Sequence, residues 1–274
     1  MSAPVFPSAD ALLEDLGITE PGELDLTVIA QHCRATILYK PLEGCAARIT
    51  GNEERAIITV DSNSRIERQR FSAGHELGHW MFDRGKVSLF SCKENAFVKE
   101  WSKNNPEARA NRYASDLLLP AAMFKPRAAP FNRVDFNTVK VLARAFTTSL
   151  TATAIRLVEH GPLPAMLVCS STEGVEWSVR GDGRKALWPQ TPGPETYAHD
   201  VLNGSEDEAS GDVLASAWFD HPVADRYQVH EHSILAYQGL VLSLLWWRNE
   251  TMLIELDDYE EERDATRSDS SWRR

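Results

Sequence analysis

Cysteine is scarce in the 274-residue chain, and its few cysteines do not form pairs. The four lie far apart, at Cys33, Cys45, Cys92 and Cys169, and none belongs to a CxxC motif. This spacing excludes a cysteine-rich zinc knuckle and is typical of a protein from a reducing compartment. We therefore expect a cytoplasmic protein.

Positive charge and long apolar runs are also in short supply. Lysine and arginine number 29 against 40 acidic residues, and the net charge of −11 disfavours binding to nucleic acid, because phosphate contacts need a basic face. No apolar run approaches the roughly 20 residues that cross a bilayer. The N-terminus lacks the basic and apolar regions of a signal peptide. We expect no membrane partner and regard direct DNA binding as disfavoured.

The overall composition, with 43% hydrophobic and 25% charged residues, is typical of a soluble globular protein. The length suggests more than one domain. Residue periodicity and turn signals predict an α+β fold. In the first half of the chain the expected helices are 9–16 and 24–34, and the expected strands are 35–40, 45–50 and 55–60.

Two longer helices follow in this first half. Asp61 or Ser62 can cap the first, which carries the sequence HELGH and ends near 83–85. Asn105 can cap the second, which has a proline at its first position and stops at Pro120.

The second half begins with two helices within 136–161, joined by the turn TTS, and then becomes strand-like. The last of the expected strands could equally be a helix, and the charged tail from residue 258 is expected to be disordered. The expected strands are 165–171, 175–181, 212–219, 228–237 and 240–247.

The sequence HELGH has the spacing of a metal site. Residues i and i+4 of a helix differ by about 40° in direction and about 6 Å in rise, so His75 and His79 can share one zinc ion. Glu76, about 100° round the helix, can reach a metal-bound water and act as its general base. Gly78 is expected to keep the metal face open. The alternative is an ordinary amphipathic helix with two histidines at its edge, and this short motif alone does not decide between them.

A third ligand would favour the metal site, because catalytic zinc usually has three protein ligands. Glu107 ranks first, since its helix has a face of small residues that permits close approach to a neighbour. A carboxylate in a first helical turn can also simply complement the helix dipole. Asn111 could hold a ligating histidine by its second ring nitrogen, or only pack. The rival ligands are Asp83, Cys92, Glu94 and Glu100.

The runs RFSAGHELGHWMF and EARANRYASDLLLP together resemble the ImmA/IrrE family of zinc metallopeptidases, over roughly residues 9–160. Tyr113 replaces the usual aromatic residue of the second motif. The resemblance implies His75, His79 and Glu107 as zinc ligands and Glu76 as the general base. Manganese is a second candidate metal, although two histidines and a carboxylate suit zinc well.

The resemblance also implies a layout and a function. The function is that of an endopeptidase that cleaves a helix-turn-helix repressor and so switches on stress, DNA-damage or mobile-element genes. The resemblance covers the first part of the expected layout, a zincin-like domain with a small sheet and an active-site helix; the residue pattern adds a helix-turn-helix-like pair packed on it, a mixed α/β C-terminal domain and a tail. The expected boundaries are 1–125, 126–162, 163–257 and 258–274.

Substrate recognition is less defined by the sequence. An extended peptide could pair with an exposed edge among the strands in 45–60. Tyr113, Arg109 and Arg112 are candidates for stabilising the oxyanion, with Tyr113 as our choice. The C-terminal domain is a candidate sensor for an unknown ligand or signal.

The helical pair and a pair of histidines near the C-terminus each have a functional and a purely structural interpretation. The helical pair has a helix-turn-helix rhythm, but its second helix offers little beyond Arg156 to read bases, which favours a structural role. His230 and His232 share one strand face, and an ordinary strand with exposed histidines is favoured over a second metal site.

Two further function classes remain as alternatives. The first is a regulatory binding protein with a structural zinc, which sequesters a repressor or toxin without cutting it. The second is a DNA-binding regulator that uses residues 136–160, which the net charge disfavours.

Overall fold

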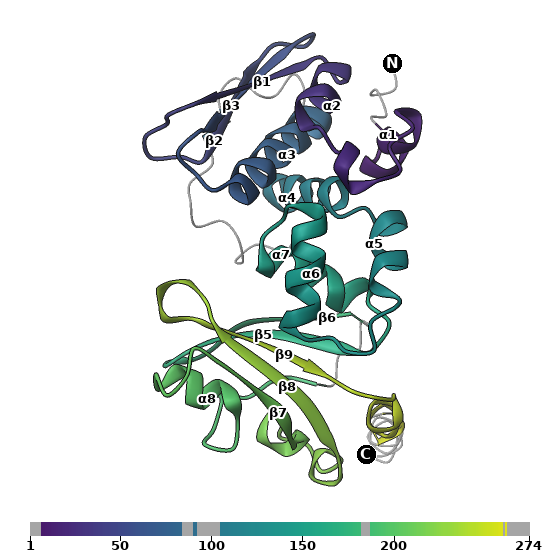
Figure 1. Cartoon of the computed structure of the whole chain (residues 1–274), viewed down its shortest axis with the longest axis vertical. Coiled ribbons are helices and arrows are strands. Elements are labelled where there is room, and N and C mark those ends of the chain that lie inside the picture. Colours follow the sequence, from purple (N-terminus) through teal and green to yellow (C-terminus); the bar gives the residue numbers. More distant parts are fainter. Residues whose placement is uncertain (1–6, 84–89, 92–104, 182–186, 260, 262–274) are drawn as a thin grey trace, which may run out of the picture. The chain divides into compact units, whose positions relative to one another are not determined.

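The computed structural model describes residues 7–83, 90–91, 105–181, 187–259 and 261. The chain is α+β, with two separate sheets (Figure 1). It divides into two compact units, and the division falls within two helices. Unit 1 comprises residues 1–127 and 141–153, and unit 2 comprises residues 128–140 and 154–274. The predicted domain boundaries stay a prediction.

Unit 1 is built on a four-stranded sheet of order β1-β3-β2-β4, in which β1 and β3 are parallel. The alternation of buried and exposed residues turns one face of β1 and β2 toward the core, and α3 lies against this sheet (Figure 1). The elements are α1 (Ala9–Asp15), α2 (Leu26–His32), β1 (Ala35–Lys40), β2 (Ala47–Gly51), β3 (Ala56–Asp61), α3 (Ile66–Asp83), β4 (Phe90–Ser91), α4 (Pro106–Leu118) and α5 (Ala121–Ala128).

The start of α3 differs from the prediction. The helix begins at Ile66 and not directly after Asp61. The Asp61 side chain instead accepts the N–H groups of Leu42 and Asn63 and the hydroxyl of Ser64, so it stabilises the turn that precedes the helix. The predicted cap of α4 is confirmed, because the Asn105 side chain accepts the Glu107 N–H at 3.0 Å.

Helices α3 and α4 pack unusually closely. A Cβ atom at Gly78 would lie 2.9 Å from the Ala110 Cα, and one at Gly74 would lie 3.3 Å from the Ala114 Cβ. The expected small-residue face of α4 is therefore confirmed as the contact face. The prediction for Gly78 was wrong: this glycine does not open the metal face but lets the backbone of α4 approach α3.

Helices α6 (Phe136–Phe146) and α7 (Leu150–His160) are bent by 108° relative to each other, as in a helix-turn-helix. Arg156, the residue considered for base reading, is only 6% exposed and pairs with Glu159 at 3.5 Å. Among the described residues no single helix is long and apolar enough to cross a membrane, and α6 with α7 meets the criteria only as this bent pair.

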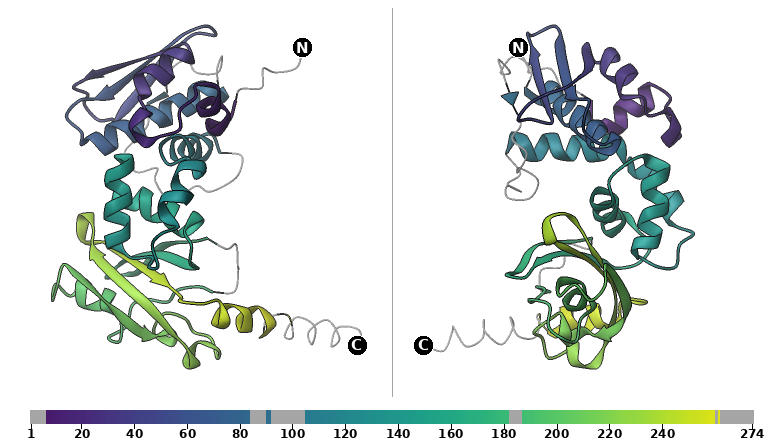
Figure 2. Two further views of the ribbon diagram at one scale, coloured as in Figure 1. Left: turned by 45° about the vertical axis from the view of Figure 1, so that its right-hand side comes forward. Right: turned by 60° about the vertical axis from the view of Figure 1, so that its left-hand side comes forward.

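Unit 2 contains a five-stranded antiparallel sheet of order β6-β5-β9-β8-β7. Helix α8 covers one face of this sheet (Figure 2), and a further helix runs over residues 251–259. Of the predicted disordered tail, residues 258 and 259 are helical and nearly all the rest lies outside the described residues. The elements are β5 (Ala165–Ser171), β6 (Gly174–Arg180), α8 (Tyr197–Leu202), β7 (Glu208–Leu214), β8 (Gln228–Leu235) and β9 (Val241–Trp246).

One strand of unit 2 differs from the prediction, and another decides between two predicted alternatives. Strand β7 begins at Glu208, inside a segment expected to be a loop, because this edge strand is polar and largely exposed and so lacks a hydrophobic signal. The segment that could have been helix or strand is strand β9, buried at all six positions between β5 and β8.

Candidate metal centre

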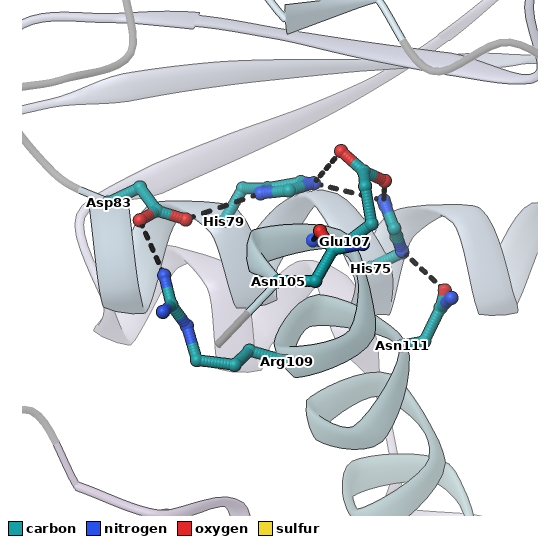
Figure 3. A network of polar contacts seen from close by, with 7 residues as sticks. All are labelled: His75, His79, Asp83, Asn105, Glu107, Arg109 and Asn111. Atoms are coloured by element: carbon teal, nitrogen blue, oxygen red, sulfur yellow. Dashed lines mark hydrogen bonds and ion pairs between the residues drawn. The ribbon is translucent and has the colours of Figure 1, made fainter. Parts of the chain in front are cut away.

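Two helices bring three potential ligand atoms together in unit 1 (Figure 3). The Nε2 atoms of His75 and His79, one turn apart on α3, lie 3.1 Å from each other. The carboxylate of Glu107, in the first turn of α4, places Oε2 3.3 Å from the His75 Nε2 and Oε1 3.3 Å from the His79 Nε2. Glu107 has this position because Asn105 caps its helix and because α4 crosses α3 at close range.

The three distances fit a metal ion. Four ligands at about 2.0–2.1 Å around a zinc ion form a tetrahedron with edges of about 3.3 Å. The observed separations of 3.1, 3.3 and 3.3 Å are close to this length, with each oxygen of Glu107 facing one histidine, and one ligand atom from each of the three residues lies within 4.8 Å of the other two. Two histidines and one carboxylate, with a fourth position left over, are the donor set of many catalytic zinc sites.

The outer nitrogens of both histidines face acceptors, which fixes the direction of their lone pairs. The Nδ1 of His75 lies 2.8 Å from the Asn111 Oδ1, and the Nδ1 of His79 lies 3.4 Å from the Asp83 Oδ2 (Figure 3). An oxygen acceptor at Nδ1 requires the proton there, so each Nε2 faces the shared space, where it donates to Glu107 when the ring is charged and can offer a lone pair to a metal when the ring is neutral. Asn111 thus has the position that the sequence suggested for it.

The charges around the cluster are coupled. Hydrogen bonds from His75 and His79 hold the pKa of Glu107 well below its usual range, against the opposing effect of burial. Burial on its own lowers the pKa of His79, but its contacts with Glu107, the charge of Glu76 and its contact with Asp83 raise it overall. The site therefore attracts positive charge.

Glu76, the expected general base, follows His75 on α3 and is 0% exposed. Its negative charge is one of the causes that raise the pKa of His79. A buried carboxylate is stable only with a cation or strong donors nearby. Glu76 and Glu107 together supply carboxylates that a divalent cation would balance.

The three oxyanion candidates take different positions. Tyr113 is 3% exposed, its ring packs edge-to-face on Phe82, and burial, with a contribution from Cys33, raises the pKa of its hydroxyl. These contacts favour a packing role for Tyr113. Arg109 pairs with Asp83 at 2.9 Å, and Arg112 is exposed on α4. The assignment of Tyr113 to the oxyanion stays a prediction with weaker support.

The rival ligands have separate outcomes. Asp83 contacts the outer nitrogen of His79 and not the shared space, so its position is that of a partner of the ligand. The other three, Cys92, Glu94 and Glu100, lie outside the described residues. What the sequence reasoning missed is the role of Asp83, although its spacing of four residues from His79 was visible.

A second metal site at His230 and His232 gains no support. Among the described residues, the cluster of His75, His79 and Glu107 is the one group that meets the geometric criterion for a metal ion. His232 is 3% exposed, which corrects the expectation of two exposed histidines.

Two packed helices of this α+β chain bring two imidazoles and a carboxylate together. This arrangement is typical of a metal-binding protein. Residues 31–158 match the family model of the IrrE N-terminal-like domain, Peptidase_M78, which points to a metallopeptidase in general. The match confirms the resemblance to the ImmA/IrrE family. A search of curated proteins returned no match.

A solved structure supports the fold. The chain is similar to a Mycobacterium tuberculosis transcriptional regulator, with a TM-score of 0.58 and 12% sequence identity, over 87% of this chain and 74% of the other. At this identity the similarity concerns the fold alone.

Proposed function

We propose that this protein is a cytoplasmic zinc endopeptidase that cleaves a helix-turn-helix transcriptional repressor and thereby switches on stress, DNA-damage or mobile-element genes. The observation that carries the proposal is the convergence of His75, His79 and Glu107 at separations of 3.1–3.3 Å, within the segment that matches a metallopeptidase family model. His75, His79 and Glu107 would hold the metal, zinc first and manganese second.

The fold of unit 1 is consistent with a zincin-like domain, in which a small sheet lies over the helix that carries the ligands. When bound, zinc would polarise the scissile carbonyl and lower the pKa of the attacking water. Glu76 would accept the proton of that water, and its burial would keep the carboxylate close to the cluster. Asn111 would orient His75 through the 2.8 Å contact at Nδ1.

The substrate would bind as an added strand. Of the strands that the sequence offered as an edge, β3 is internal, since it pairs with β1 on one side and β2 on the other. The described residues of β4 pair with β2 only at Arg48 and Ile49. The edge formed by β2 and β4, on the sheet that packs on α3, is therefore the proposed site for the peptide.

The test is co-expression with the helix-turn-helix repressor that is encoded nearest to this protein's gene. Glu76→Gln should slow cleavage by about 10²–10⁴-fold, the usual contribution of a general base, while zinc content stays that of the wild type. Glu67→Gln, in the first turn of the same helix, is the matched control and should cleave normally. Cleavage that persists in Glu76→Gln would contradict the mechanism.

The second candidate function is a regulatory protein that binds a repressor or toxin without cutting it and uses zinc only for structure. The complete burial of Glu76 favours this candidate, because its carboxylate has no exposed surface in the described structure. If wild type and Glu76→Gln both leave the repressor intact but relieve repression, the binding function is correct. The DNA-binding alternative loses support, since Arg156 is buried and paired.

A further inference from the structure

Asp83, at the last position of α3, connects the second histidine to the neighbouring helix. Its side chain is only 6% exposed. Its two oxygens have different partners: Oδ2 lies 3.4 Å from the Nδ1 of His79, and Oδ1 lies 2.9 Å from a terminal nitrogen of Arg109 (Figure 3). A buried carboxylate requires such compensation, and the arginine supplies the opposite charge.

Arg109 comes from α4, two residues after Glu107. The first turns of α4 thus supply both the carboxylate that faces the Nε2 atoms and the guanidinium that reaches the carboxylate behind His79. The guanidinium also lies 5.9 Å from the ring centre of Phe82, which limits its freedom. Arg109 therefore contacts Asp83, and Asp83 contacts His79.

We propose that Asp83 and Arg109 are positioning residues for His79: Asp83 holds the Nδ1 proton so that Nε2 presents its lone pair to the metal, and Arg109 holds Asp83 in place. The inference rests on the metal site of the proposed function. It also makes the two histidines unequal. His75 is oriented by the neutral amide of Asn111, whereas His79 is oriented by a carboxylate, which increases the basicity of a ligating imidazole more strongly.

A purely structural role predicts a different result. An ion pair between Asp83 and Arg109 that only links α3 to α4 would contribute to the stability of unit 1 and not to the affinity for metal. Metal affinity, measured on folded protein, therefore separates the two roles. The visible absorption of the cobalt(II)-substituted protein gives a second reading, since it responds to the geometry of the ligands and not to global stability.

The experiment is a zinc titration of the full chain against a chromophoric chelator, with the cobalt(II) spectrum recorded in parallel. Asp83→Ala should weaken zinc binding by about 10- to 100-fold, as is typical for the partner of a ligating histidine. Asp83→Asn keeps an acceptor at the same place and should lose less, and it carries the test if Asp83→Ala does not fold. Arg109→Gln should weaken binding alone but have no further effect in the Asp83→Ala background, because Arg109 acts through Asp83.

The matched control is the ion pair between Arg127 and Glu20, which also lies in unit 1; in the described part of the chain neither residue forms a hydrogen bond or ion pair with His75 or His79. Glu20→Gln and Arg127→Gln should leave zinc affinity and the cobalt spectrum unchanged. If the wild type binds zinc and the Asp83 variants bind it equally well, the positioning role is wrong and the proposed function stands. If the wild type binds neither zinc nor cobalt, the proposed metal site itself is wrong.

Discussion

The two units each contain a pair of histidines with similar backbone spacing but opposite arrangements. His75 and His79 on α3 are separated by roughly 6 Å of helix, and His230 and His232 on β8 by roughly 6.6 Å of strand. In unit 1 the two Nε2 atoms lie 3.1 Å apart and share Glu107. In unit 2 each histidine has its own carboxylate, Asp212 for His230 and Glu208 for His232, both at 2.9 Å.

The difference shows that spacing does not by itself make a metal site. His232 uses both ring nitrogens within unit 2, since its Nδ1 accepts the Phe136 N–H at 3.2 Å while its Nε2 contacts Glu208. No lone pair remains for a metal. In unit 1 Asn111 and Asp83 lie at the outer nitrogens, and the inner nitrogens converge on Glu107. The position of the acceptors distinguishes the two pairs.

The largest expected difference between the two histidine pairs is in zinc binding, after removal of a carboxylate that contacts each pair. Glu107→Ala should weaken zinc binding by more than the roughly 10- to 100-fold typical of an outer partner, because it removes a direct ligand. Glu208→Ala should leave zinc binding unchanged, since Glu208 contacts His232 and Lys140. Zinc content after dialysis and competition titration measure both. Unchanged zinc binding in Glu107→Ala would return Asp83 to consideration as a ligand.

A smaller effect is expected from adding one methyl group at a glycine in each unit. Gly78→Ala places a Cβ against the α4 backbone, and overpacking of this kind costs about 1–3 kcal/mol. Gly211→Ala in β7 meets the end of the Tyr197 side chain, which can move away, so the loss should be smaller. Denaturant unfolding of both variants gives the comparison. If both variants lose the same free energy of unfolding, the close packing of α3 on α4 does not make Gly78 more sensitive to an added methyl group.

The smallest effect concerns pH. Burial lowers the pKa of His232, despite its contact with Glu208. The folded state then binds fewer protons than the unfolded state, so this stability is present above the unfolded pKa of about 6.5 and is lost as the pH falls. His232→Gln should flatten the decline in melting temperature between neutral and mildly acidic pH, with His230→Gln as control. An unchanged slope in His232→Gln would contradict this assignment.

Local pattern was enough to predict much of the site. The helical period placed His75 and His79 together, and a cap followed by proline predicted the start of α4 and so the position of Glu107. The small face of α4 predicted its close contact with α3. These features depend on residues that are close together in the sequence, so they can be predicted from local patterns.

Features that depend on distant contacts were missed. The role of Gly78 depends on Ala110, and the role of Asp83 depends on Arg109, 26 residues away. Helix α4 ends at Leu118, as the stop at Pro120 predicted, but helix α5 directly after it was not predicted. Strand β7 is held by its pairing with β8 and not by apolar residues of its own. The spacing of Asp83 from His79 was visible in the sequence, but its contact with Arg109 and the contact of Gly78 with Ala110 have no local signal.

The glycine and alanine contact between α3 and α4 has a consequence for how the metal is exchanged. Because backbone packing holds the two helices together, the three ligand atoms stay close whether or not an ion lies between them. Such a site differs from a zinc finger, which unfolds when its metal is removed. If zinc binds as proposed, the protein would be expected to lose the ion to a chelator, remain folded, and bind zinc again when it is restored.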